Sequence, residues 1–402
     1  MDEINVNQLI TSYLRKIQKT PVLFKRYLYD QIDWNNWVIG IKGERGVGKT
    51  TLILQYIKEH FPDKSKALYV SLDNFWFVAN SLLDLVEYFY THGGTHLFLD
   101  EVHHYQNWQT IIKNICDDYP DLHIVYTSSS MLQIDHLQGD LSRRQVVYTL
   151  KGMSFREFLD FEGLAKVPAV SMESIIQNHT EIAMDITGRG FKVLSAFAQY
   201  FKYGYYPFYK REASGFGFRL QEVVNQILES DLPATEEVSY ATIQKAKRML
   251  MILAQRVPQL PKMSELYAEL ETNRELGLKM LYALQRAGLL NFVSVEQKNF
   301  RSMSKPDKIL LGNPNLMNAL SMSADIGARR EAFFVNQVSE KHNIILPKSG
   351  DFLVDGKYLF EVGGKNKTFA QIRNIPDSFL AVDDTEVGLN NRIPLWIFGL
   401  MY

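Results

Sequence analysis

The sequence contains a single cysteine, Cys116, among its 402 residues. One thiol cannot form an internal disulfide, so a disulfide-stapled secreted domain is excluded. The chain also lacks an apolar run of the roughly 18 to 20 residues that a membrane-spanning helix needs. Its first residues lack the basic segment and apolar run of a secretory signal. We therefore expect a cytoplasmic protein with no membrane segment.

An excess of charge of either sign is also missing. Lys and Arg total 44 and Asp and Glu total 45, which gives a formal net charge of −1. This balance excludes an overall attraction to DNA or to an anionic membrane, and leaves DNA contact only to local basic patches. The apolar fraction of 46% and the charged fraction of 22% are ordinary for soluble globular proteins. A chain of this length usually forms two or more domains, and we expect at least two.

Short apolar runs alternate with longer amphipathic stretches between Trp37 and Leu150. This pattern is typical of a parallel sheet covered by helices, which is an α/β fold. The expected strands are Val38–Ile41, Ala67–Val70, His96–Leu99, Ile124–Tyr126 and Val146–Tyr148.

A phosphate-binding motif follows the first of these strands. The pattern G-x-x-x-x-G-K-[ST] lies between a strand and a stretch with helical spacing, which is the context that a P-loop requires. Its backbone N–H groups and the helix N-terminus favour phosphate, Lys49 is expected to meet the β- and γ-phosphates, and Thr50 to ligate Mg²⁺. The sequence therefore predicts a site for a nucleoside triphosphate, most simply ATP with Mg²⁺. The predicted binding residues are Gly43, Glu44, Arg45, Gly46, Val47, Gly48, Lys49, Thr50 and Thr51.

Two carboxylates, Asp100 and Glu101, end the third expected strand. The tip of a strand that faces the P-loop is where the metal and the attacking water are handled. Asp100 is expected to hold Mg²⁺ through its water shell, and Glu101 to orient or deprotonate the water. His103 and His104 follow, but adjacent residues do not share a helix face and no third ligand has suitable spacing, so we expect them to be structural.

Three further residues are candidates for catalysis. Thr127 and Ser128 end the fourth expected strand, where a hydroxyl can reach the γ-phosphate or the lytic water; the alternative is a serine-rich turn. Arg144 precedes the fifth strand, next to Arg143. In an oligomeric ATPase such an arginine can stabilise phosphoryl charge in a neighbouring subunit's site. A solvated surface charge is the equal alternative, and the sequence leaves both open.

The rest of the chain is mixed. Residues 154–241 are helical and aromatic, and basic residues among the aromatics leave single-strand binding as an alternative to a packed core, which we favour. Residues 242–305 predict three helices and a strand, the order of a winged helix. Residues 306–402 predict strands at Phe352–Val354, Tyr358–Val362 and Leu395–Phe398.

These motifs, together with Leu99–His104, Asn107-Trp108 and Leu150–Leu159, resemble those of bacterial and archaeal AAA-superfamily ATPases with a C-terminal nuclease-like domain. The resemblance implies a P-loop ATPase core at 1–153, a helical lid at 154–241, a winged helix at 242–305 and a restriction-endonuclease-like domain at 306–402.

The resemblance also predicts the chemistry of the last domain. Glu331, Asp351 and Glu361 match the carboxylates of PD-(D/E)xK nucleases, which bind Mg²⁺ and use a lysine two residues after the last acid. Here that position is Gly363, and the nearest lysines are Lys365 and Lys367, so we expect the domain to be inactive.

The leading interpretation is therefore an ATPase in which MgATP hydrolysis drives movement of domains or of a protein partner. A nucleotide-gated DNA-binding protein or nuclease, and a non-hydrolysing ATP switch, are the alternatives.

Overall fold

The computed structural model describes residues 3–129, 141, 143–211, 214–235, 237–256, 262–295, 305–321 and 325–402. The chain divides into two compact units. Unit 1 comprises Met1–Lys151 and Ser230–Glu237, and unit 2 comprises Gly152–Glu229 and Val238–Tyr402. Among the helices described, none combines the length and apolar character needed to cross a bilayer.

The centre of unit 1 is a parallel sheet of five strands in the order β2-β3-β4-β1-β5. Each strand coincides with an apolar run of the sequence, so all five expected strands are confirmed. The strands are β1 (Val38–Gly43), β2 (Ala67–Ser71), β3 (His96–Asp100), β4 (His123–Ser129) and β5 (Gln145–Leu150).

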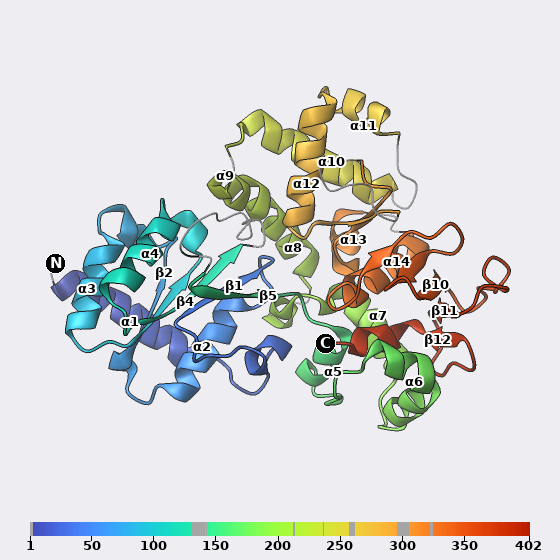
Figure 1. Ribbon diagram of the computed structural model, residues 1–402, viewed down its shortest axis with the longest axis horizontal. Helices are drawn as coiled ribbons and strands as arrows, with labels where there is room; N and C mark the ends of the chain where they lie inside the picture. The colour runs from blue at the N-terminus through green and yellow to red at the C-terminus, as the bar shows by residue number, and fades with distance from the viewer. Residues whose placement is uncertain are drawn as a thin grey trace. The chain divides into compact units, whose positions relative to one another are not determined.

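Helices cover both faces of this sheet (Figure 1). From β1, an inner strand of the sheet, the chain passes to β2 at one edge and then returns through β3 to β4. Because parallel crossovers are right-handed, this reversal puts α2 (Lys49–His60) on one face and α3 (Leu82–Thr91) and α4 (Trp108–Asp118) on the other. The N-terminal helix α1 (Glu3–Lys19) packs against α2 and β2. The short α9 (Leu232–Thr235) joins the unit from much later in the sequence.

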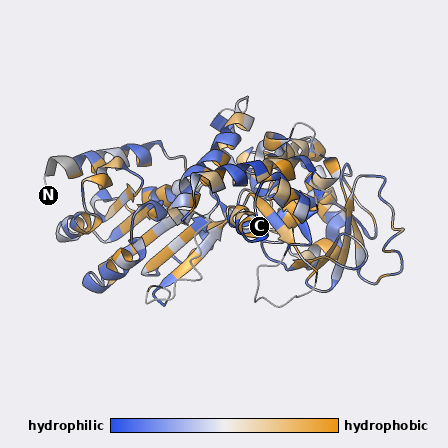
Figure 2. Cartoon of the chain, turned by 90° about the horizontal axis from the view of Figure 1, so that it is seen from above, coloured by the Kyte–Doolittle hydropathy of each residue, from blue (hydrophilic) through white to orange (hydrophobic). Residues whose placement is uncertain are grey.

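Strands β1, β2 and β3 of unit 1 are almost wholly buried, which explains their continuous apolar sequences, whereas β5 at one edge is partly exposed. Ile39 and Ile41 on β1 and Leu97, Phe98 and Leu99 on β3 are fully buried. Figure 2 shows these hydrophobic strands beside helices that alternate hydrophobic and hydrophilic residues.

Unit 2 begins with the helical, aromatic segment that we expected to be a lid of the P-loop domain. The structure groups it differently, because residues 152–229 belong to unit 2 and only 230–237 join unit 1. The reason is its aromatic core: Tyr200 packs against both Phe155 and Phe333, with ring centroids 5.7 and 5.8 Å apart. These aromatics therefore form a core, as we favoured over a binding surface. The elements are α5 (Phe155–Phe161), α6 (Met172–Thr187), α7 (Val193–Gln199), a π-helical turn (Tyr200–Gly204), η7 (Pro207–Arg211) and α8 (Phe216–Gln226).

Three helices and a strand follow in the order expected, and a second strand, which was not expected, pairs with the first. The helices are α10 (Tyr240–Arg256), α11 (Met263–Glu269) and α12 (Arg274–Arg286), and β6 (Leu290–Val293) pairs antiparallel with β7 (Lys308–Leu311). Asn273 begins α12 by accepting a hydrogen bond from the backbone N–H of Leu276 at 2.8 Å. Of the polar, basic stretch at residues 300–307, which is expected to form the wing or a linker, residues 300–304 lie outside the described residues.

The C-terminal part of unit 2 is a second five-stranded sheet, ordered β12-β11-β10-β9-β8, with α14 packed on β10. Strands β10, β11 and β12 are parallel, whereas β9 and β8 are antiparallel. The helices here are α13 (Pro314–Leu320) and α14 (Ile326–Val338), and the strands are β8 (Ile344–Ile345), β9 (Phe352–Val354), β10 (Tyr358–Gly363), β11 (Ser378–Val382) and β12 (Arg392–Pro394).

The strands expected near 352 and 358 are confirmed, but the strand expected at Leu395–Phe398 is wrong. Leu395–Leu400 forms a 3₁₀ helix, η9, in which every residue is buried. A continuous apolar run that is buried on all sides has no periodicity to distinguish strand from helix.

Candidate active site

The P-loop connects β1 to α2, as its motif predicts. Gly46 and Gly48 have φ of 85° and 103°, a conformation that favours glycine, and Gly48 is the N-cap of α2. Gly43 is required for a different reason, since a Cβ there would lie 2.3 Å from the carbonyl oxygen of Leu150 on β5. The loop therefore presents backbone N–H groups at a helix N-terminus, a geometry suited to phosphate.

Lys49 is buried and its ammonium is aimed into the loop. The Lys49 Nζ donates to the carbonyl oxygens of Gly43 at 2.8 Å and Glu44 at 3.0 Å. The next residue, Thr50, donates from Oγ1 to Oδ2 of Asp100 at 2.8 Å. The loop and the tip of β3 thus meet, as the sequence predicts for the two motifs.

Asp100 is the centre of a hydrogen-bond network. Besides Thr50, the Tyr69 hydroxyl donates to Oδ2 at 2.7 Å, and the Thr127 hydroxyl donates to Oδ1. Thr127 also accepts from the backbone N–H of Glu101 at 3.0 Å. Burial raises the pKa of the Tyr69 phenol, so it remains a donor to the carboxylate. Thr127 therefore orients both acids, whereas its expected contact with the γ-phosphate stays a prediction.

Glu101 has a strained backbone. Its φ of 55° and ψ of 45° are left-handed, which costs a residue with a Cβ about 1 to 2 kcal/mol. The 3₁₀ turn η4 (Val102–His104) follows at once. Such strain persists where the surrounding structure enforces it, commonly at functional sites. Here the hydrogen bond from its N–H to Thr127 helps to fix the conformation.

Asp231 enters this site from a distant part of the sequence. Its Oδ1 lies 3.0 Å from Nη1 of Arg45 in the P-loop, 3.7 Å from Nε2 of His103 and 3.8 Å from Nε2 of His104. Burial alone would raise the pKa of Asp231, but the hydrogen bond from His103 and the charge of Arg45 lower it below its ordinary value. Burial and the neighbouring His103 lower the pKa of His104.

Sequence reasoning missed three supporting residues, Asp231, Tyr69 and Arg26. Asp231 is 186 positions from its partner Arg45, and no local motif marks it. Tyr69 lies on a strand whose apolar pattern says nothing of its hydroxyl. The buried Arg26 donates to the carbonyl oxygen of Val47 in the P-loop, and to that of Lys151 at 2.7 Å. In the sequence, the only sign of this role was the presence of an arginine, Arg26, before the first strand.

Ser128 and Arg144 take no part in the network of Asp100. Ser128 is fully buried on β4, and its Oγ has no hydrogen-bond partner among the residues that the structure describes. Arg144 is exposed and pairs with Asp117. Arg144 directly precedes β5, whose first residue pairs with the first residue of β1. Arg144 therefore lies at the end of the strands opposite to the P-loop. Arg144 does not reach the loop of its own chain, and its role in a neighbouring subunit stays a prediction.

Unit 2 contains the carboxylates expected from the nuclease-like pattern. Glu331 lies on α14, Glu361 on β10, and Asp351 just before β9. The Nζ of Lys367 lies 3.4 Å from Oε2 of Glu361 and 3.9 Å from Oδ2 of Asp351. Lys308 on β7 pairs with Glu331 at 2.7 Å. Burial raises the pKa of Glu331 above its ordinary value, against the opposing charge of Lys308.

Gly363 explains how the Lys367 side chain reaches Glu361 and Asp351. A Cβ at Gly363 would lie 2.8 Å from Cδ of Lys367, so the glycine leaves room for the lysine side chain. The sequence offered Lys365 and Lys367 as the nearest lysines. Of these two, the structure brings Lys367 to the two carboxylates.

Comparison with protein families places the P-loop residues in a known class. Residues 35–159 match the family model of an AAA domain. The similarity to this family covers less than half of the chain. Residues 194–327, in unit 2, match a domain of unknown function. A comparison with curated proteins gives no match.

Solved structures resemble the chain only distantly. A Walker-type ATPase of Pyrococcus abyssi is 13% identical with a TM-score of 0.38, over 74% of this chain and 95% of that one. DnaA from Aquifex aeolicus, bound to AMPPCP, is 14% identical with a TM-score of 0.28, over 64% and 84% of the two chains. Structural similarity this low shows nothing about function. The function of residues 35–159 is therefore inferred from their own side chains and backbone.

Proposed function

We propose that the AAA domain binds MgATP and hydrolyses it. The observation that carries this proposal is the meeting of the P-loop with the two acids that end β3. The Thr50 hydroxyl lies 2.8 Å from the Asp100 carboxylate, beside the buried Lys49. This hydrogen bond would let the Thr50 hydroxyl oxygen ligate Mg²⁺ while Asp100 holds the ion through its water shell.

The roles follow from the chemistry of each side chain. The loop N–H groups and Lys49 bind the phosphates, and Thr50 and Asp100 hold the metal, which supplies charge neutralisation at the transferred phosphoryl group. Glu101 orients and deprotonates the attacking water. Thr127 and Tyr69 fix Asp100, and Thr127 also holds the backbone of Glu101. Hydrolysis then drives a conformational change that reaches unit 2 or a protein partner.

The first test is nucleotide binding by Lys49→Ala. Removing the ammonium deletes a charge-assisted contact worth about 1.5 to 3 kcal/mol, so we expect MgATP affinity to fall roughly 10- to 100-fold. Lys19→Ala, at the exposed end of α1, is the matched control and retains the parent affinity. Calorimetric titration of both variants measures this, and unchanged affinity in Lys49→Ala would exclude the loop as the phosphate site.

A second candidate function belongs to unit 2. The expectation that its nuclease-like domain is inactive depended on the missing lysine at position 363. The contact of Lys367 with Glu361 and Asp351 removes that reason. We propose, as the alternative activity, that Glu331, Asp351 and Glu361 bind a divalent metal and that Lys367 activates water for cleavage of a nucleic acid.

A further inference from the structure

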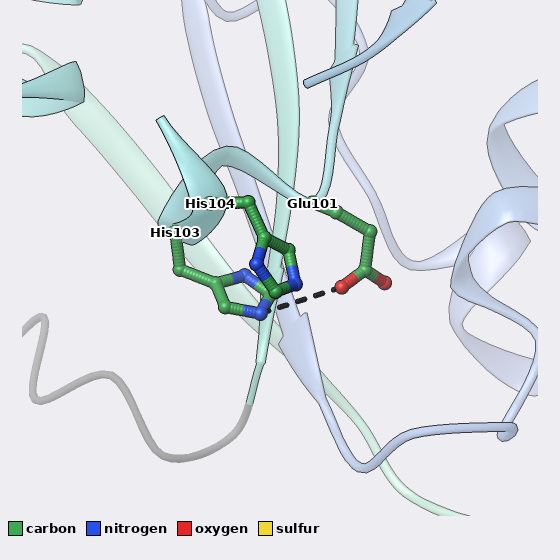
Figure 3. Close-up of side chains that lie close together, drawn as sticks. All are labelled: Glu101, His103 and His104. Carbon is green, nitrogen blue, oxygen red and sulfur yellow. Dashed lines mark ion pairs between the residues drawn. The ribbon is translucent and has the colours of Figure 1, made fainter. Parts of the chain in front are cut away.

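A second group of metal-ligand atoms lies beside the proposed ATP site. Glu101, His103 and His104 each offer one ligand atom, and these atoms all lie within 4.8 Å of one another. Figure 3 shows both imidazole rings turned toward the Glu101 carboxylate, with His103 Nε2 3.5 Å from Glu101 Oε2.

His103 and His104 were expected to be structural, partly because adjacent residues do not share a helix face. That expectation assumed an α-helix, whereas Glu101 is left-handed and Val102–His104 is a single 3₁₀ turn. The two rings consequently lie close together, tilted by 39° with their centroids 4.2 Å apart.

Asp231 lies beside this group and offers a further carboxylate oxygen. Its Oδ1 lies 3.7 Å from His103 Nε2 and 3.8 Å from His104 Nε2. With metal–ligand bonds of about 2.0 to 2.1 Å, neighbouring ligand atoms of a tetrahedral Zn²⁺ site lie roughly 3.4 Å apart. The separations between His103 and Glu101 and between Asp231 and each histidine, 3.5 to 3.8 Å, are slightly longer than this spacing.

The surroundings also suit a cation. Two carboxylates face the histidines, and only one cationic side chain, Arg45, contacts Asp231 among the described ion pairs. A cavity of ≈ 880 Å³, lined in part by Arg45, His104 and Ser230, borders the cluster and gives an ion access from solvent. Arg45 competes with a metal for Asp231.

We propose that Glu101, His103, His104 and Asp231 bind one divalent transition-metal ion of the zinc class, and that the bound ion inhibits ATP hydrolysis. Imidazole and carboxylate ligands together favour such ions over Mg²⁺. The inhibitory part depends on the proposed function, because a metal that ligates Glu101 takes away the carboxylate that acts on the water.

The direct test is Co²⁺ binding to the metal-free full chain. The titration contains excess Mg²⁺, which occupies the sites that are built only from oxygen ligands, such as Thr50 with Asp100. We expect one Co²⁺ per chain, with the visible absorption of a four- or five-coordinate ion, and displacement by Zn²⁺. His104→Ala, at a partly exposed position, should weaken binding by about 10-fold or more, and His92→Ala, on an exposed turn, should not. Arg45→Ala should strengthen binding because it removes the competing cation.

Two results would contradict the proposed metal site. Absence of Co²⁺ binding, or equal binding by His104→Ala and the parent, overturns the proposal and leaves the cluster as a network of ion pairs. Retained circular dichroism and MgATP affinity in His104→Ala show that any loss is not unfolding.

A second measurement separates the site from the proposed function. Zn²⁺ should inhibit the MgATPase of the parent and leave His104→Ala at its own zinc-free rate. Metal binding without any ATPase activity contradicts the proposed function alone, whereas hydrolysis that Zn²⁺ leaves unchanged overturns the inhibitory role.

Discussion

At the scale of single residues, the site is a set of hydrogen bonds that converge on Asp100. Thr50 comes from the P-loop, Tyr69 from β2 and Thr127 from β4. The motifs predicted Thr50 and Asp100 because their chemistry requires a fixed local spacing. They could not predict Tyr69 or Asp231, because contacts between distant segments depend on strand order and chain return.

Another residue-scale feature is the histidine at the start of β3. His96 stacks on His123 with ring centroids 4.6 Å apart, and Phe61 meets it edge-on. Burial, and then the neighbouring His123, lower the pKa of His96 to about 4. The folded chain therefore keeps His96 neutral at pH values where an unfolded chain, with an ordinary histidine pKa of about 6.5, already binds a proton.

This difference predicts a loss of stability in acid. Between pH 6.5 and 4 the unfolded state binds more protons at this position, so the free energy of unfolding falls as the pH falls through that window. His96→Phe keeps the stacking and removes the proton, so its stability should fall less steeply than that of the parent. Urea unfolding at several pH values measures the slopes, with His60→Phe, at an exposed position, as the control. Equal slopes for His96→Phe and the parent would contradict the assignment.

At the scale of elements, apolar periodicity predicted the strands of unit 1, but it failed where a segment is buried on all sides. The strands of unit 1 are separated by long amphipathic stretches, so their number and order in the chain were clear. The run Leu395–Leu400 is buried throughout and had no such contrast. Strands β11 and β12 were missed as well, and β12 spans only Arg392–Pro394.

The element-scale prediction concerns β10 and the loop after it. Lys367 contacts Glu361 and Asp351, whereas Lys365 is exposed. If the second candidate function is right, the parent cleaves plasmid or single-stranded DNA with Mg²⁺ or Mn²⁺. Lys367→Ala should lose this cleavage and Lys365→Ala should retain it.

The two lysine variants form a matched pair, because they remove the same charge two residues apart. DNA left intact by the parent, with ATP present or absent, rejects the second candidate. Cleavage that Lys365→Ala loses and Lys367→Ala keeps would move the catalytic role to Lys365.

At the scale of the whole molecule, the chain combines two units that are interleaved in sequence. Unit 1 takes Ser230–Glu237 from the middle of the segment that otherwise builds unit 2. Asp231 in this insertion pairs with Arg45 of the P-loop. A change at the proposed nucleotide site would therefore have a covalent route to unit 2 through both ends of the inserted segment.

The central claim is that this molecule hydrolyses MgATP with Glu101 acting on the water. An amide at this position still accepts a hydrogen bond but is a very poor base, so Glu101→Gln should lose turnover and keep nucleotide affinity. Glu87→Gln, on the exposed face of α3, is the control and should retain both.

The decisive measurement is steady-state ATP hydrolysis, with MgATP affinity determined on the same preparations of parent, Glu101→Gln and Glu87→Gln. The account predicts Mg²⁺-dependent turnover by the parent that falls roughly 100-fold or more in Glu101→Gln, with affinity within a few-fold of the parent. Turnover by Glu101→Gln at the parent rate would contradict the catalytic role of Glu101, and a parent that binds MgATP without hydrolysing it would be a switch and not an ATPase.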